Sequence, residues 1–249
     1  MLVAAGATSA AHAQTHSGDI VLMLINSRLA TSGGPSGSYT GPLTGRVFDG
    51  FFPSGGSTTS PGFDSAPGLL QPGETIRVDF AREVLYWNGT QLTTSPRSMT
   101  VGLGSSQVTL SPTDFSGKTG FEIAGGEPNG AFHQHPFFQI GSEAPAGVYG
   151  AIMRLAMVRS GSNGPVTFGT SLPFLMTFRR NASTLNPAAG LNAMADVLAT
   201  VPDVPPAVPE PTTLGLAAAG AIAGLAARFR RRPRKNRTRN TFASAYVMH

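Results

Sequence analysis

The segment from Val148 to Val158 has the side-chain pattern of a long β-strand. Neighbouring side chains of a strand point to opposite sides, so a run of apolar residues two apart lies on one face. Five such residues face away from Arg154: Tyr149, Ala151, Met153, Leu155 and Met157. We expect this face to point inward and Arg154 to lie on the other side.

Several other segments have the same character and are bounded by turn residues. They are Asp19 to Ile25, Glu74 to Phe80, Val84 to Trp87, Val166 to Phe168 and Leu172 to Phe178. Asn88-Gly89 favours a tight hairpin turn before Gln91-Leu92, because both residues tolerate positive φ. The 31 glycines, 20 prolines and 12% charged residues also indicate turns and strands. We therefore predict an all-β fold, an antiparallel β-sandwich of about eight to ten strands.

Two regions depart from the strand pattern. Residues 31–73 are rich in glycine and proline and are expected to form loops. Residues 188–199 are compatible with a short helix, and four prolines between Pro202 and Pro209 predict an extended, stiff spacer after it.

The C-terminal region has an uncharged apolar run from Leu214 to Ala227, preceded by Pro209, Glu210 and Pro211. The run is shorter than the roughly 17–25 residues of a usual membrane helix, so its length alone would also suit a buried core helix. Its Ala/Gly content and the basic cluster that follows favour a membrane anchor. The flanking arginines are Arg228, Arg230, Arg231 and Arg232. This order of segments resembles the PEP-CTERM sorting signal, which implies that a membrane-embedded exosortase recognises the chain.

The basic residues are concentrated behind that apolar run. Eight of the 18 lie between Arg228 and Arg239, whereas all 13 acidic residues come earlier, so the rest of the chain has 10 basic and 13 acidic groups. The positive-inside rule then keeps the tail in the cytoplasm and the body outside. Binding of nucleic acid is not expected, because the body has no basic surface to support it.

The N-terminus has features of a secretory signal. Leu2 to Ala11 is small and apolar, and Ala11-His12-Ala13 fits cleavage by signal peptidase before Gln14, although no basic residue precedes it. A disordered alanine-rich terminus is the alternative. The expected order is a signal-peptide remnant (1–13), a β-sandwich body (14–181), a stem or linker (182–207), the sorting signal with its transmembrane helix (208–232) and a basic cytoplasmic tail (233–249). The protein should be exported, anchored in the membrane, and then located at the cell surface or in the extracellular matrix.

Histidines give the best candidate for a functional site. The chain has no cysteine, and only His16, His133 and His135 fall within the expected exported body. Spaced two apart on a strand, His133 and His135 would share a face, and His16 precedes Asp19 by three residues. Zinc accepts imidazole and carboxylate ligands, so these four residues could form a tetrahedral site. Alternatively, the two histidines lie on an edge strand ended by Pro136 and bond to carbonyls or water.

Several blocks of the body are similar to bacterial surface-anchored β-domains with a His-x-His motif. The blocks are His16-x-x-Asp19-Ile20, Pro61-Gly62-Phe63, Trp87-Asn88-Gly89-Thr90, His133-x-His135-x-Phe137-Phe138 and Pro145-Ala146-Gly147-Val148-Tyr149. Some of these proteins are associated with zinc homeostasis, so the resemblance favours zinc as a cofactor.

Enzyme activity is not expected, because the motifs of serine hydrolases, zinc proteases and phosphate-binding loops are missing from the sequence. Asp114 and Glu122 could be a carboxylate pair, but a turn role for Asp114 and a solvent-facing strand position for Glu122 explain them better. The alternative to a zinc-binding surface protein is a metal-free sandwich that binds extracellular polysaccharide or has a structural role in the matrix. Exposed aromatic side chains would favour this alternative.

Overall fold

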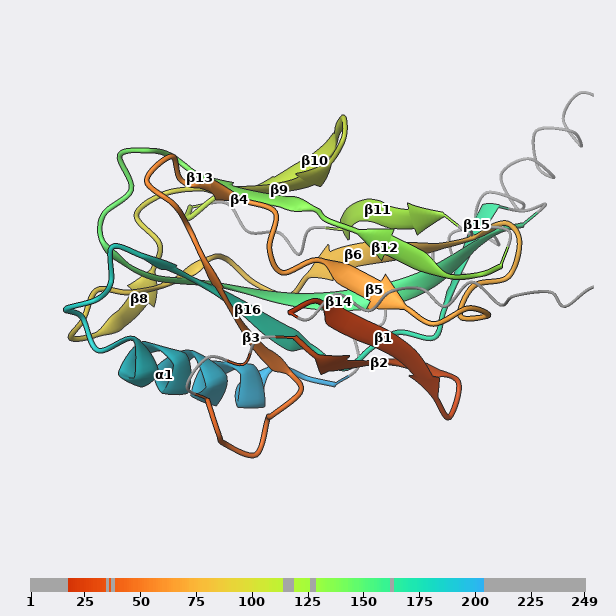
Figure 1. Cartoon of the computed structure of the whole chain (residues 1–249), viewed down its shortest axis with the longest axis horizontal. Helices are drawn as coiled ribbons and strands as arrows, with labels where there is room; N and C mark the ends of the chain where they lie inside the picture. Colours follow the sequence, from red (N-terminus) through yellow and green to blue (C-terminus); the bar gives the residue numbers. More distant parts are fainter. Residues whose placement is uncertain are drawn as a thin grey trace, which may run out of the picture. The chain divides into compact units, whose positions relative to one another are not determined.

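The computed structural model describes residues 18–203, except 35, 37–38, 114–118, 126–128 and 162–163. These residues form sixteen strands and one helix (Figure 1). The strands are β1 (Ile20–Ile25), β2 (Arg28–Gly33), β3 (Val47–Phe51), β4 (Ser57–Thr58), β5 (Phe63–Ser65), β6 (Glu74–Phe80), β7 (Leu85–Trp87), β8 (Leu92–Thr94), β9 (Met99–Leu103), β10 (Ser106–Leu110), β11 (Thr119–Gly125), β12 (Phe132–Gln134), β13 (Phe137–Ile140), β14 (Gly147–Gly161), β15 (Gly164–Phe168) and β16 (Phe174–Arg180). The helix is α1 (Pro187–Thr200).

The long strand β14 is the centre of the largest sheet. This sheet has the order β11-β6-β14-β16-β3, and β7, β8 and β15 extend it along β14. Two four-stranded sheets accompany it, with the orders β12-β5-β1-β2 and β10-β9-β13-β4. The strand expected from Val148 to Val158 is thereby confirmed and is longer than its pattern indicated.

The main core lies between the three sheets. Its buried side chains include Phe63 from the first small sheet, Phe138 from the second, and Met153 from β14. All five residues predicted to face inward from β14 belong to this core. The period-two pattern therefore identified the correct face.

The opposite face of β14 is also covered, which the sequence did not indicate. Helix α1 packs there, and Leu191, Met194 and Leu198 are buried against Val148 and Ile152. Arg154 lies on this face with 7% exposure and donates a hydrogen bond to the carbonyl of Pro202. The side chains of both small sheets thus pack with one face of β14, and α1 packs on the other. Figure 1 shows α1 and the β10-β9-β13-β4 sheet on opposite sides of the large sheet.

Helix α1 was expected at residues 188–199, within the segment interpreted as a stem. Asn186 caps its N-terminus by accepting a hydrogen bond from the backbone N–H of Ala189, and Pro187 opens the first turn. Because its apolar side is buried, α1 is part of the same compact unit as the strands, and this unit ends at Asp203.

No helix among the described residues is long and apolar enough to cross a membrane. The predicted anchor helix, the sorting motif and the flanking arginines lie outside the described residues, as do the expected signal remnant, His16 and the cytoplasmic tail.

Two parts of the predicted topology need correction. Most pairings are antiparallel, but β1–β5 and β3–β16 are parallel, so two of the three sheets are mixed. The expected Asn88-Gly89 hairpin does form between β7 and β8, yet its turn is longer than two residues. Only Gly89 has a positive φ there, and Asn88 instead accepts hydrogen bonds from the backbone N–H groups of Thr90 and Gln91.

Two tyrosines form hydrogen bonds to the Pro145-to-Tyr149 block and fix the turn at the start of β14. Tyr149 donates its hydroxyl to the carbonyl of Pro145, and Tyr86 donates to that of Ala146, each at 2.7 Å. Burial raises the pKa of both phenols, so both remain protonated donors. The turn before the central strand is thus fixed by bonds from inside the core.

Candidate metal site

Three strands bring the candidate ligands to one face of a small sheet. Strand β5 lies between β1, which it pairs in parallel, and β12, which it pairs in antiparallel fashion. His133 is directly opposite Asp64, and Asp64 is directly opposite Val21. Asp19 is two residues before Val21 and His135 is two residues after His133, so all four polar residues are expected on the same side.

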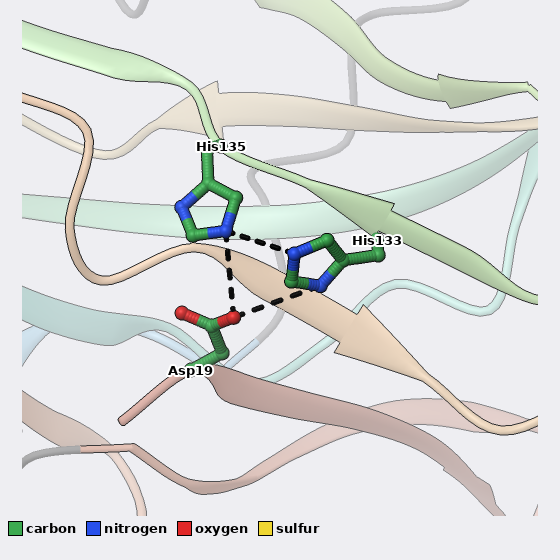
Figure 2. A group of neighbouring side chains, drawn as sticks. All are labelled: Asp19, His133 and His135. Atoms are coloured by element: carbon green, nitrogen blue, oxygen red, sulfur yellow. Dashed lines mark hydrogen bonds and ion pairs between the residues drawn. The ribbon is translucent and has the colours of Figure 1, made fainter. Parts of the chain in front are cut away.

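Asp19, His133 and His135 converge on one point (Figure 2). One ligand atom from each lies within 4.8 Å of the others. The two Nε2 atoms of the histidines are 2.9 Å apart. Oδ2 of Asp19 is 3.6 Å from Nδ1 of His133 and 3.6 Å from Nε2 of His135.

Backbone groups orient two of the three side chains. Oδ1 of Asp19 accepts a hydrogen bond of 2.8 Å from the N–H of Gly62, and Nδ1 of His135 is 2.8 Å from the carbonyl oxygen of Thr59. Gly62 has no room for a side chain, since a Cβ there would lie 2.7 Å from the His135 ring. The Pro61-Gly62 block therefore positions both residues, which gives that part of the sequence a local structural role.

The two histidines of the site are partly exposed to solvent, whereas the carboxylate of Asp19 is buried. The side chains of His133 and His135 are 35% and 39% exposed, whereas that of Asp19 is 6% exposed. Among the described residues, Oδ2 of Asp19 has no hydrogen-bond donor. A buried carboxylate oxygen beside two imidazoles has the chemistry of an incomplete cation site.

Three of the four residues predicted as metal ligands thus lie close together. The structure brings Asp19, His133 and His135 together, and His16 lies outside the described residues. The alternative proposed for the histidines is also partly correct, because His135 contacts a backbone carbonyl and β12 is an edge strand.

Asp64 is a polar residue at this site that the sequence analysis missed. It is 1% exposed, and its Oδ1 lies 3.9 Å from Nδ1 of His133. The signal in the sequence was an acidic residue directly after the Pro61-Gly62-Phe63 block, the only charged residue between Gly50 and Gly73. It was overlooked because the surrounding region was expected to be loop.

The pair of carboxylates considered for catalysis is not seen as a pair. Asp114 lies outside the described residues, and Glu122 is exposed on β11, where it pairs with Arg77 of β6. The position of Glu122 agrees with the solvent-facing role expected for it.

Comparison with known proteins gave one match, which concerns the C-terminal region. Residues 207–232 match the PEP-CTERM protein-sorting motif. No curated protein and no solved structure matched the chain. The motif agrees with the segment predicted from Pro209-Glu210-Pro211, the apolar run and the arginines. It supports an exosortase-substrate sorting domain at the C-terminus and implies export to a membrane-associated or cell-surface location, with exosortase as the processing partner.

Proposed function

We propose that the protein is an exported, exosortase-processed surface protein that binds one zinc ion through Asp19, His133 and His135. His16, three residues before Asp19, is the proposed fourth ligand. The role is one of binding and not of catalysis. The observation that carries the proposal is the convergence of two imidazoles and a buried carboxylate oxygen.

The distances between the nitrogen and oxygen atoms of these side chains suit an ion with tetrahedral coordination. Zinc bonds to nitrogen and oxygen are about 2.0–2.2 Å long, so two ligands of a tetrahedral site are about 3.3–3.5 Å apart. The two Nε2 atoms are 2.9 Å apart, and Oδ2 of Asp19 is 3.6 Å from Nε2 of His135, so these two distances lie on either side of this range. Small side-chain adjustments would therefore be enough to accommodate the ion.

The donor types fit zinc and disfavour metals that need thiolate or all-oxygen sites. The chain has no cysteine, which argues against a thiolate site for copper(I) or an iron–sulfur cluster. Calcium and magnesium prefer sites made of oxygen ligands, whereas this site includes two imidazoles. Zinc binds mixed nitrogen and oxygen ligands readily.

Zinc bound here would join segments that are distant in sequence. Asp19 precedes β1, whereas His133 lies on β12 and His135 just after it. Since an ion that binds only the folded state stabilises it by mass action, loss of zinc should lower the melting temperature. A body without disulfides would gain from this link between its first strand and a late one.

The test is to measure metal content and thermal unfolding of the full chain purified in detergent. We expect about one zinc per chain, and a melting temperature that a chelator lowers in the wild type but not in a His133→Ala, His135→Ala double variant. Gln134→Ala is a matched control, because Gln134 lies between the two histidines on the same segment and should leave the chelator effect intact. Equal melting curves with and without chelator, with no bound metal by elemental analysis, would contradict the proposal.

The carbohydrate alternative has mixed support among the described residues, because Phe51 is 56% exposed but Trp87 is engaged in packing. Trp87, the chain's only tryptophan, packs against Gly190 of α1 and donates its indole N–H to the carbonyl of Leu185. It therefore serves the packing of the helix and is not presented for stacking on a sugar ring.

A further inference from the structure

Asp64 is a buried carboxyl group that receives no hydrogen bond from the part of the chain that the structure describes. It is 1% exposed, and neither of its carboxylate oxygens has a hydrogen-bond donor among the described residues. Burial of a carboxylate without a partner is costly, so such a group calls for an explanation. Its nearest ion-pair contact is Nδ1 of His133, at 3.9 Å.

The tautomer of His135 follows from its contact with the backbone. The carbonyl of Thr59 can only accept a hydrogen bond, so Nδ1 of His135 carries a proton and donates it. In the neutral ring, Nε2 then has a free lone pair. This lone pair is directed toward the point where the three side chains meet.

The contact between the two histidines constrains His133. Their Nε2 atoms are 2.9 Å apart, and two bare lone pairs would repel at that distance, so a proton or a cation has to lie between them. The other nitrogen of His133, Nδ1, faces oxygens of Asp19 and Asp64. These carboxylates favour a proton on Nδ1, and with the proton there Nε2 is the ring nitrogen able to bind a metal.

We propose that Asp64 is a positioning residue whose carboxylate, 3.9 Å from Nδ1 of His133, favours a proton on that nitrogen and so presents Nε2 to the ion. This inference rests on the proposed zinc function. It assigns both histidines the same orientation, with Nε2 toward the metal. Nδ1 of His135 is hydrogen-bonded to the Thr59 carbonyl, and Nδ1 of His133 lies near the Asp64 carboxylate without a hydrogen bond between them. Partners of this kind fix the orientation of a metal-binding histidine and increase its basicity.

Asp64 acts through His133 and is not itself a ligand. The three mutually close ligand atoms belong to Asp19, His133 and His135, and the contact of Asp64 is with the nitrogen of His133 that faces away from His135. Oδ2 of Asp19 is 3.6 Å from Nε2 of His135, a proposed ligand nitrogen, and is therefore the better placed of the two carboxylates to bind the ion.

The test compares Asp64→Asn with the wild type, using the full chain. Loss of the carboxylate should weaken zinc affinity about 10- to 100-fold while leaving one ion bound at saturation. Without metal, the same variant should melt at an unchanged or higher temperature, because an unpartnered buried charge has been removed. A residue with a purely structural role would not give lower affinity together with unchanged or greater stability of the metal-free protein.

The matched control is Asp49→Asn. Asp49 is also a buried aspartate, 4% exposed, but it lies on β3 and pairs with Arg179. This control should keep the wild-type zinc affinity. If the wild type binds no zinc, the proposed function fails; if the wild type binds zinc and Asp64→Asn binds it equally well, only the role of Asp64 is overturned.

A second measurement does not depend on any variant. Nuclear magnetic resonance of the nitrogen atoms in the zinc-loaded wild type should find His133 protonated at Nδ1 and coordinated through Nε2. Coordination through Nδ1 would overturn the inference.

Discussion

At the scale of single residues, the protein treats its buried charges in different ways. Arg180, which is 4% exposed, donates to the carbonyls of Pro53, Ser54, Ser142 and Ala144 and so joins two loops. Asp49 is neutralised by Arg179 at 2.9 Å and accepts a hydrogen bond from Thr177. Asp19 and Asp64 have oxygens that find no donor among the described residues, and both carboxylates lie beside the histidines. Unpartnered charge is thus concentrated where a cation would compensate it.

The burial of Asp49 predicts how the stability of the protein depends on pH. Burial raises the pKa of this carboxyl above its ordinary value, more than Arg179 and Thr177 lower it. The folded state therefore holds the proton more tightly than the unfolded state does, so stability falls as pH rises from about 3.9 through the raised pKa. Asp49→Asn should remove this fall.

Urea unfolding of both proteins at a series of pH values checks this prediction. The difference in unfolding free energy between Asp49→Asn and the wild type should shift in favour of the variant as pH rises through that interval, and then level off. Parallel profiles for the two proteins would show that Asp49 ionises alike in the folded and unfolded states.

At the scale of elements, prediction succeeded where the pattern was local and long. β6 and β14 were found because five or more alternating positions mark their faces, and His133 and His135 were placed on one face by their spacing alone. Short strands have too few positions to show a period. β3, β4 and β5 lie in the region expected to be loop, and the parallel pairing of β5 with β1 joins segments about 40 residues apart.

The candidate site shows the same limit. Asp19, His133 and His135 were selected by residue type, but their meeting depends on β5, which the sequence did not reveal. Asp64 was missed for that reason, since its partner His133 becomes visible only when the register of β5 and β12 is known. Pairing between distant segments carries little signal in a single sequence.

Helix α1 gives a prediction at this scale. Leu198 is fully buried between α1 and the large sheet, so Leu198→Ala should lower the free energy of unfolding by about 2–5 kcal/mol. The exposed Asn192 on the same helix supplies the control, because Asn192→Ala should change stability by no more than about 0.5 kcal/mol. Chemical denaturation of each variant measures both effects. An unchanged stability of Leu198→Ala would mean that α1 detaches from the body in solution.

At the scale of the whole molecule, charge follows the order of segments. The chain has a formal net charge of +5, yet all 13 acidic residues precede Arg228 and eight basic residues follow from that position onward. The basic charge thus belongs to the end of the chain that contains the sorting motif, residues 207–232. This separation suits a chain whose body is exported while its basic end is retained on the inner side of the membrane.

The sorting motif leads to a prediction about processing. Glu210 is the only charged residue between Val204 and Ala227, so it is the feature most able to distinguish this site from an ordinary apolar segment. If exosortase cleaves near Pro209-Glu210-Pro211, Glu210→Ala should accumulate as the full-length membrane form with its basic tail still attached. Mass spectrometry and an antibody against the tail would detect this form.

The control is Glu143→Ala, which changes an exposed glutamate in the body and should be processed like the wild type. Normal cleavage of Glu210→Ala would mean that the protease recognises the apolar run and the arginines without the glutamate. Recovery of the wild-type chain uncleaved in the cytoplasm would contradict the assignment of location itself.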